Sequence, residues 1–207
     1  MKIWNKALLI VFHPLDCIDI IKREKDHFQI WVVVLLYSMT FLVNYVYIFL
    51  VHFPLASKAP TDASLLLEAA MVVVPMFSWA LGSYLVTAIM SGESRFSEVL
   101  TATSYALVPY IALTPVLGLM SNVLGFSEQG SYQFIKFLTL FWVVLLLLMA
   151  LKRLNDYSLS KAIGVALLSV IAVIIMWAVC LLMFSLTVQL IFFFTGFGGE
   201  INLKFFL

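Results

Sequence analysis

The stretch that decides the fold is residues 79–115, which reads WALGSYLVTAIMSGESRFSEVLTATSYALVPYIALTP. An apolar helix arrives at Ser91–Gly92, where Gly92 is a natural helix stop, and a second apolar helix departs after a short charged turn at residues 93–96. Because the turn is so short, we predict that the two helices return on each other as a hairpin.

Small residues give this hairpin a physical basis for packing. In lipid the hydrophobic effect does not drive helix association, and small residues four apart let two backbones approach closely. The first helix carries Ser78 and Gly82 at this spacing, and the second carries Ala102 and Ala106. We therefore predict a seam between the second and third membrane spans. The candidates for packing or partner binding are Ser78, Gly82, Gly92, Ala102, Tyr105, Ala106 and Pro109.

Composition places the whole chain in the membrane. Of its 207 residues 64% are apolar and 11% are charged, whereas soluble domains carry roughly 25% charged residues. We expect an all-α polytopic membrane protein whose length leaves no room for a separate soluble domain. The basic residues are few and lie next to apolar segments, which argues against a nucleic-acid partner.

Apolar segments long enough to cross a bilayer predict a bundle of five spans, at residues 28–53, 65–90, 98–124, 132–151 and 161–195. Residues 1–27 are predicted to form two short amphipathic helices around Pro14, lying in the interface with cationic side chains toward the lipid headgroups. The fifth segment would be about 50 Å long against a core of about 30 Å, so it must tilt, project or break near Ser185–Gln189. The glycines after Thr195 predict a helix end and an external interfacial tail at residues 196–207.

Orientation follows from the distribution of Lys and Arg, which concentrate in cytoplasmic loops. On the opposite side this chain has only Lys58 and Lys204, with Lys136 near the head of the fourth span. We predict a multi-pass protein of the cell membrane with a cytoplasmic N-terminus and an external C-terminus. The predicted cytoplasmic basic residues are Lys2, Lys6, Lys22, Arg23, Lys25, Arg95, Lys152, Arg153 and Lys161.

No catalytic signature is present: the chain has no HExxH, no nucleophile elbow and no phosphate-binding loop. His13, Asp16 and Asp19 share a three-residue spacing, but helix capping explains them better than a metal site. We predict no enzymatic activity, no cofactor and no metal.

Polar residues inside apolar spans are the remaining candidates, because such residues are costly in lipid. Asn44 is predicted to join helices by hydrogen bonding, and Glu68, about one turn inside its helix, to reach the outer interface. Thr101, Ser104 and Tyr105 form a polar stripe on the third span. This stripe is either the lining of a pathway or a packing seam in which the hydroxyls bond to backbone, and we favour the seam.

Four stretches together resemble one known family. They are FHP at residues 12–14, SGESRFSEVL at 91–100, TSYALVP at 103–109 and LKRLNDYSLSKAIG at 151–164. In this order, within five spans, they resemble bacterial members of the Yip1 domain family over about residues 10–195. The resemblance implies a bundle of five transmembrane helices.

The resemblance also bears on function. Eukaryotic relatives act in vesicle traffic and bind small GTPases through a long N-terminal region with an Asp-Leu-Tyr-Gly-Pro motif. Residues 1–27 contain no such motif, so GTPase binding is not expected. Some bacterial relatives accompany sugar-transport operons. The leading hypothesis is a non-enzymatic organiser or accessory subunit of a membrane complex, binding lipid and other membrane proteins or a second copy of itself. The alternative is a transporter or lipid-handling protein that uses the polar face of the third span.

Overall fold

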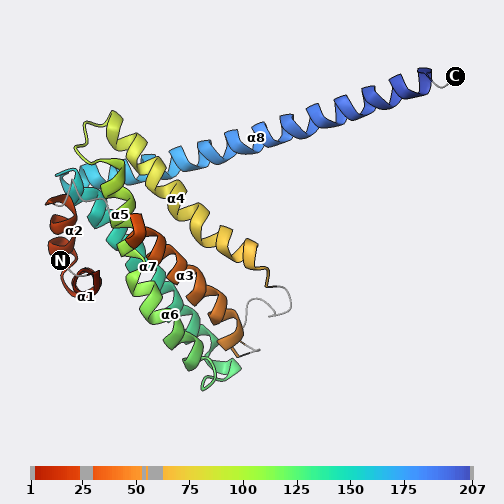
Figure 1. Ribbon diagram of the computed structural model, residues 1–207. Coiled ribbons are helices and arrows are strands. Elements are labelled where there is room, and N and C mark those ends of the chain that lie inside the picture. Colours follow the sequence, from red (N-terminus) through yellow and green to blue (C-terminus); the bar gives the residue numbers. More distant parts are fainter. Residues whose placement is uncertain (1–2, 24–29, 53–54, 56–62, 206–207) are drawn as a thin grey trace.

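The computed structural model describes the backbone of residues 3–23, 30–52, 55 and 63–205, which is helical and contains no strand (Figure 1). Five segments are long and apolar enough to span a membrane: 30–50, 65–89, 96–120, 129–154 and 159–193. The prediction of an all-α polytopic membrane protein is thus confirmed. The elements are α1 (Ile3–Phe12), α2 (Pro14–Arg23), α3 (Ile30–Leu50), α4 (Leu65–Ile89), α5 (Phe96–Ala106), α6 (Val108–Met120), the 3-10 helix η3 (Phe126–Glu128), α7 (Gln129–Leu154) and α8 (Leu159–Phe205).

The third span consists of two helices, α5 and α6, because Pro109 has no N–H to donate to the carbonyl four residues earlier. Leu107 lies at the break, and its N–H bonds to Ser104 O at 3.2 Å. The interruption of the third span therefore occurs at Pro109. Pro115 lies inside α6 without ending it, as Pro75 does in α4.

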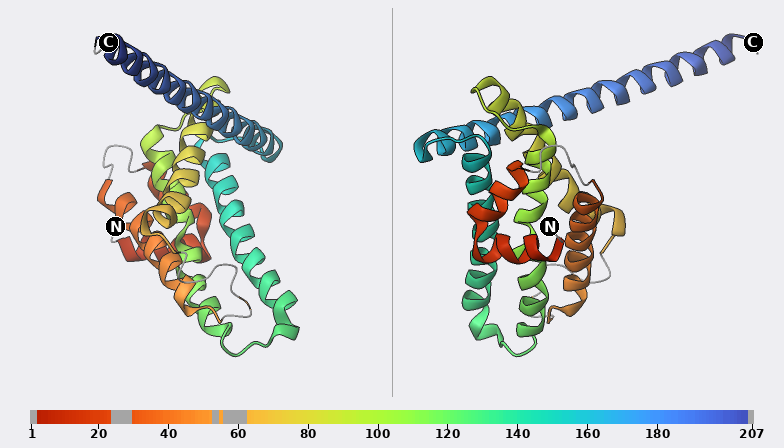
Figure 2. Two further views of the ribbon diagram at one scale, coloured as in Figure 1. Left: turned by 90° about the vertical axis from the view of Figure 1, so that its right-hand side faces the viewer. Right: turned by 60° about the vertical axis from the view of Figure 1, so that its left-hand side comes forward.

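The bundle is built on α3, α5–α6 and α7, with α4 crossing them at an angle (Figures 1 and 2). Its apolar core joins side chains from helices far apart in the chain. Leu36 of α3, Tyr105 of α5 and Leu146 of α7 belong to one buried cluster, together with Ile18 of α2. The N-terminal helices are thus part of the packed structure.

Two cations of the N-terminal helices do not project outward as predicted, whereas the placement of the others toward lipid headgroups stays a prediction. Lys6 is 5% exposed, and Lys22 forms an ion pair with Asp156 instead of facing outward. The physical reason is that α2 buries its apolar face, Cys17, Ile18 and Ile21, against the bundle. Arg23 is exposed, whereas Lys2 and Lys25 lie outside the described residues.

The hairpin of α4 and α5 is present, since Phe96 of α5 packs its ring 5.5 Å from Tyr84 and 6.2 Å from Phe77 of α4. The predicted small-residue seam is wrong for its first half, however. Ser78 Oγ accepts a hydrogen bond from Trp177 Nε1 at 3.2 Å, and a Cβ on Gly82 would lie 2.6 Å from Val173 Cγ2. These two residues therefore face α8, which crosses α4 on that side (Figure 1).

Helix α8 runs unbroken from Leu159 to Phe205 and projects far beyond the bundle (Figure 2). Of the three alternatives, tilt, projection or a break near Ser185–Gln189, the break does not occur, because no proline stands there and Thr187 bonds to its own helix at Met183 O. The predicted helix end at Gly196 is also wrong. Glycine weakens a helix by only about 1 kcal/mol and stops one when it adopts a left-handed conformation, which these glycines do not. The placement of residues 196–207 at an external interface stays a prediction.

Candidate functional site

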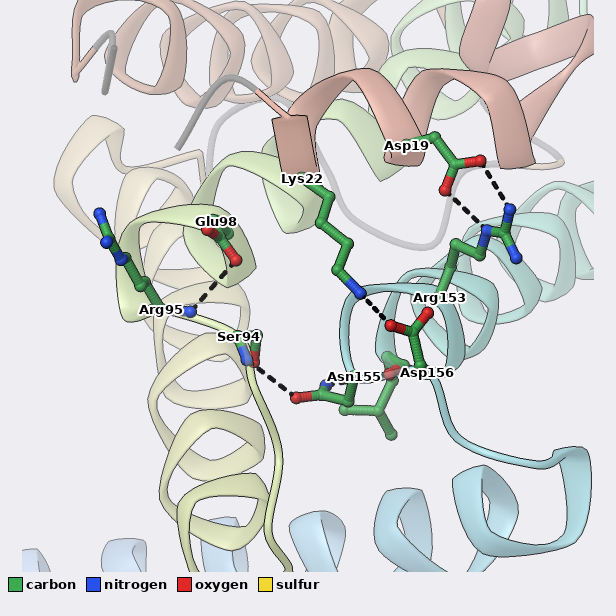
Figure 3. Close-up of polar contacts among 9 residues, drawn as sticks. Asp19, Lys22, Ser94, Arg95, Glu98, Arg153, Asn155 and Asp156 are labelled. Atoms are coloured by element: carbon green, nitrogen blue, oxygen red, sulfur yellow. Dashed lines mark hydrogen bonds and ion pairs between the residues drawn. The ribbon is translucent and has the colours of Figure 1, made fainter. Parts of the chain in front are cut away.

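The turn between α4 and α5 lies against the turn between α7 and α8 (Figure 3). Ser94 N donates to Asn155 Oδ1 at 3.2 Å, and Tyr157 OH donates to Met90 O at 3.2 Å. Asn155 is held in turn by its Nδ2, which donates to Leu151 O at 3.0 Å. Two of the four stretches that carry the sequence resemblance, residues 91–100 and 151–164, thus meet in space.

Gly92 makes this contact possible. A Cβ at this position would lie 2.4 Å from Asn155 Oδ1 and 2.8 Å from Tyr157 OH, so no side chain fits between the two turns. The sequence suggested that Gly92 ends the helix, but the left-handed residue after α4 is Ser91, with φ of 58°. Gly92 N donates to Thr87 O at 2.8 Å, which completes the Schellman-type cap. The glycine is therefore required for close approach and not for its φ angle.

Helix α2 is joined to the end of α7 and to the turn that follows it by two ion pairs (Figure 3). Arg153 holds Asp19 in a fork, with Nε to Oδ1 at 2.6 Å and Nη2 to Oδ2 at 2.7 Å. Lys22 pairs with Asp156. The hydrogen bonds and charge of Arg153 hold the pKa of the Asp19 carboxyl below its usual range. Sequence reasoning missed these pairs, because residues 134 apart in the chain give no local signal.

Two hydroxyls of the polar stripe on the third span bond to the backbone of their own helix. Thr101 Oγ1 donates to Ser97 O at 2.7 Å, and Ser104 Oγ donates to Thr101 O at 2.7 Å. Tyr105, Ala102 and Ala106 are buried in the core, each at most 2% exposed, and Pro109 is buried at the start of α6. This arrangement favours the packing interpretation over a pathway.

The two intramembrane candidates, Asn44 and Glu68, meet each other. Asn44 Nδ2 donates to Glu68 Oε2 at 3.3 Å, and Asn44 Oδ1 accepts from Tyr110 OH at 3.0 Å. The chain of contacts links α3, α4 and α6. Glu68 is only 4% exposed, so the expectation that it reaches the outer interface is wrong. Tyr110 was missed, although a lone tyrosine hydroxyl inside an apolar helix was a usable signal.

The part of α8 that follows Trp177 exposes polar as well as apolar side chains. Residues 177–193 are exposed on all sides of the helix, with only Val188 half-buried. Ser185 and Gln189 lie four apart on this segment, and the Gln189 amide makes no hydrogen bond to any described residue. We define residues 178–190 as the free arm of α8.

Among the described residues, no three His, Cys, Asp or Glu side chains gather closely enough to hold a metal ion. His13 and Asp16 thus lie in α2 and the turn before it without forming a site of that kind.

Comparison with known protein families places residues 8–181 within the Yip1 domain. No curated protein and no solved structure matches the chain.

Proposed function

The chain belongs to the Yip1 domain family, a family of membrane proteins, and we propose from this premise that it is a non-enzymatic organiser or accessory subunit of a membrane complex. In this proposal the free arm of α8 binds a helix of another membrane protein. A transport system is one such complex, and an accessory subunit of it carries out no chemical reaction itself.

Apolar exposure alone does not argue for a partner, because lipid covers apolar side chains as well as protein does. Gln189 differs from these apolar residues because its side-chain amide needs hydrogen-bond partners. A side-chain amide in hydrocarbon without a hydrogen-bond partner costs several kcal/mol, roughly 2–7 depending on the reference state. Gln189 is flanked by apolar residues, among them Phe184, 69% exposed, and Phe192, 71% exposed. A partner helix that bonds to the amide removes this cost.

Ser185 strengthens the argument because it lies one turn before Gln189 on the same helix face. A small residue next to a polar one allows the close approach that interhelical hydrogen bonds require. Thr187 differs, since its hydroxyl is satisfied by Met183 O at 2.8 Å. The single observation that carries the proposal is therefore the Gln189 amide, which bonds to no described residue, on an exposed arm of α8.

The native cysteines allow a direct test. Cys180 is exposed on the arm, whereas Cys17 is buried. A photo-crosslinker attached to Cys180 in native membranes should yield a defined crosslinked species. Gln189→Leu should reduce its yield, and Thr187→Val should leave it unchanged. Equal yields from all three proteins, or a purely monomeric product, would contradict the proposal.

The alternative, a transporter or lipid-handling protein using the third span, finds less support. A pathway needs polar groups that are available to a substrate, but the hydroxyls of Thr101 and Ser104 donate their hydrogen bonds to backbone carbonyls of their own helix. The two functions are distinguished by testing whether the Glu68→Gln protein restores the phenotype of a strain that lacks the protein. A stable Glu68→Gln protein that reproduces the deletion phenotype would favour the transporter.

A further inference from the structure

A small cavity between α3, α6 and α7 contains two polar groups, on Thr114 and Lys136, that make no hydrogen bond to the described residues. It has a volume of about 60 Å³, several times the roughly 10–15 Å³ that a single water needs. Tyr47, Tyr110, Thr114 and Lys136 line it together with the apolar Leu117 and Leu140.

The cation at this cavity lacks a counter-ion. Lys136 is half-buried, and its Nζ lies 5.4 Å from the centre of the Tyr47 ring. It makes no ion pair or hydrogen bond to any described residue. Lys22 and Arg153, by contrast, each form an ion pair with a carboxylate. The contact with the ring leaves ammonium donors available, because an ammonium group carries three N–H bonds.

Thr114 behaves unlike the other threonines of the described helices. Its Oγ1 is buried, with the residue 3% exposed, and makes no hydrogen bond. A helix threonine normally donates to a carbonyl three or four residues earlier. That bond is made by Thr40, Thr87, Thr101, Thr103, Thr139 and Thr187. Thr114 Oγ1 instead lies near the Tyr110 hydroxyl without a hydrogen bond of normal geometry, so its donor remains available at the cavity.

The charges around the cavity favour an anion. The carboxylate of Glu68 is held by Asn44 and does not line the cavity. The hydroxyl hydrogen of Tyr110 is directed to Asn44 Oδ1, so this residue offers only an acceptor. The unused groups are thus one ammonium and one hydroxyl donor, which is the complement of an oxyanion.

The position of the cavity indicates where the oxyanion comes from. Tyr47 is three residues before the end of α3, Thr114 six before the end of α6, and Lys136 seven after the start of α7. At 1.5 Å per residue these are about 5, 9 and 10 Å inside the helix ends. The ends meet on one side of the bundle, since Asn122 Nδ2 donates to Leu50 O at 3.0 Å. A lysine at this depth reaches toward the headgroup level.

We propose that this cavity binds the phosphate of an anionic membrane phospholipid, with Lys136 as its charge partner and Thr114 as a hydrogen-bond donor. The apolar walls, Leu117 and Leu140, contact the upper part of an acyl chain. They also disfavour a free phosphate ion, which would lose its hydration against them. The lipid would fasten α7 to α6 and α3 at this end of the bundle.

Native mass spectrometry of the full chain, released from nanodiscs of mixed phosphatidylcholine and phosphatidylglycerol, tests the proposal. The wild type should retain one phosphatidylglycerol in preference to phosphatidylcholine. Lys136→Gln should lower this retention about tenfold or more, and Thr114→Val about threefold to tenfold. Lys136→Arg should keep most of it. The matched control is Lys161→Gln, because Lys161 also lies over a tyrosine ring, 4.1 Å from that of Tyr157, but away from the cavity. It should behave as wild type.

Three results would overturn the inference. The first is equal retention by Lys136→Gln and the wild type. The second is equal retention of the two lipids by the wild type, which would leave the cavity to water. The third is displacement of the bound lipid by excess inorganic phosphate, which would assign the site to a soluble oxyanion. If Lys136→Gln does not fold, Thr114→Val decides by the same measurement, since valine keeps the shape of threonine. Gln189→Leu should not change lipid retention, so this test is independent of the proposed partner site.

Discussion

Replacing Gly82 by alanine tests the packing of α8 on α4. An added Cβ would lie 2.6 Å from Val173 Cγ2 and 3.4 Å from Ser169 O. The first distance is far below van der Waals contact, so α8 must move or Val173 must leave its rotamer. Overpacking of this size costs about 1–3 kcal/mol. Alanine recovers roughly 0.5–1 kcal/mol of helix propensity, which leaves a net loss of about 0–2.5 kcal/mol.

The chain supplies its own control for this experiment. Gly164 lies within α8, and a Cβ there would meet nothing within 4 Å. Gly164→Ala should therefore stabilise the protein by about 0.5–1 kcal/mol through helix propensity alone. Gly82→Ala combined with Val173→Ala should regain stability relative to the sum of the single changes, because the second substitution removes the clashing methyl group.

Thermal unfolding in detergent, followed by tryptophan fluorescence, measures these differences. For a chain of this size about 1 kcal/mol corresponds to roughly 2–4 °C in Tm. Trp177 reports on this seam, because its Nε1 bonds to Ser78. A Gly82→Ala protein as stable as Gly164→Ala would refute the assigned contact between α4 and α8. Additive effects of the Gly82 and Val173 changes would show that these two residues do not touch.

Three further predictions concern the contact between the α4–α5 and α7–α8 turns, the ion pair of Asp19 with Arg153, and the orientation of the chain in the membrane. Gly92→Ala should lower Tm by the equivalent of about 1–3 kcal/mol, because its Cβ would lie 2.4 Å from Asn155 Oδ1, whereas Gly130→Ala, with nothing within 4 Å, should not. In the folded protein the pKa of Asp19 lies below the ordinary value of 3.8. The ion pair of Asp19 with Arg153 therefore stabilises the folded state above pH 3.8, and this stabilisation is lost as the pH falls through the lower pKa of the folded state. Asp19→Asn should therefore lower Tm at neutral pH and approach the wild type in acid, and a constant difference across the pH range would contradict the pairing with Arg153. Reporter fusions should place the α4–α5 and α7–α8 turns in the cytoplasm and the other loops and the C-terminus outside, and a cytoplasmic C-terminus would contradict the five-span orientation. The fusion sites are Glu93 and Asp156 for the cytoplasm, and Lys58, Glu128 and Leu207 for the exterior.

Sequence alone was sufficient for the number and approximate position of the spans. An apolar run of about 20 residues is a local property, and lipid forces its backbone into a helix because no water is available to satisfy the peptide groups. The interruption at Pro109 is equally local, since the missing N–H belongs to the residue itself. The pairing of α4 with α5 also follows locally, because the six connecting residues, 90–95, leave α5 little choice of neighbour.

Tertiary structure decided which face of each helix meets which neighbour. Gly82 had the right spacing for a seam with α5, yet it packs on Val173 of α8, some 90 residues later in the chain. Small residues allow two helices to approach closely, but they do not specify which helix is the partner. A helix that is apolar on every side has no sequence periodicity that indicates its buried face. The same holds for polar groups. The partners of Glu68 and Asp19 are chosen by long-range packing, which brings Asn44 and Arg153 within hydrogen-bonding distance only once the bundle has closed.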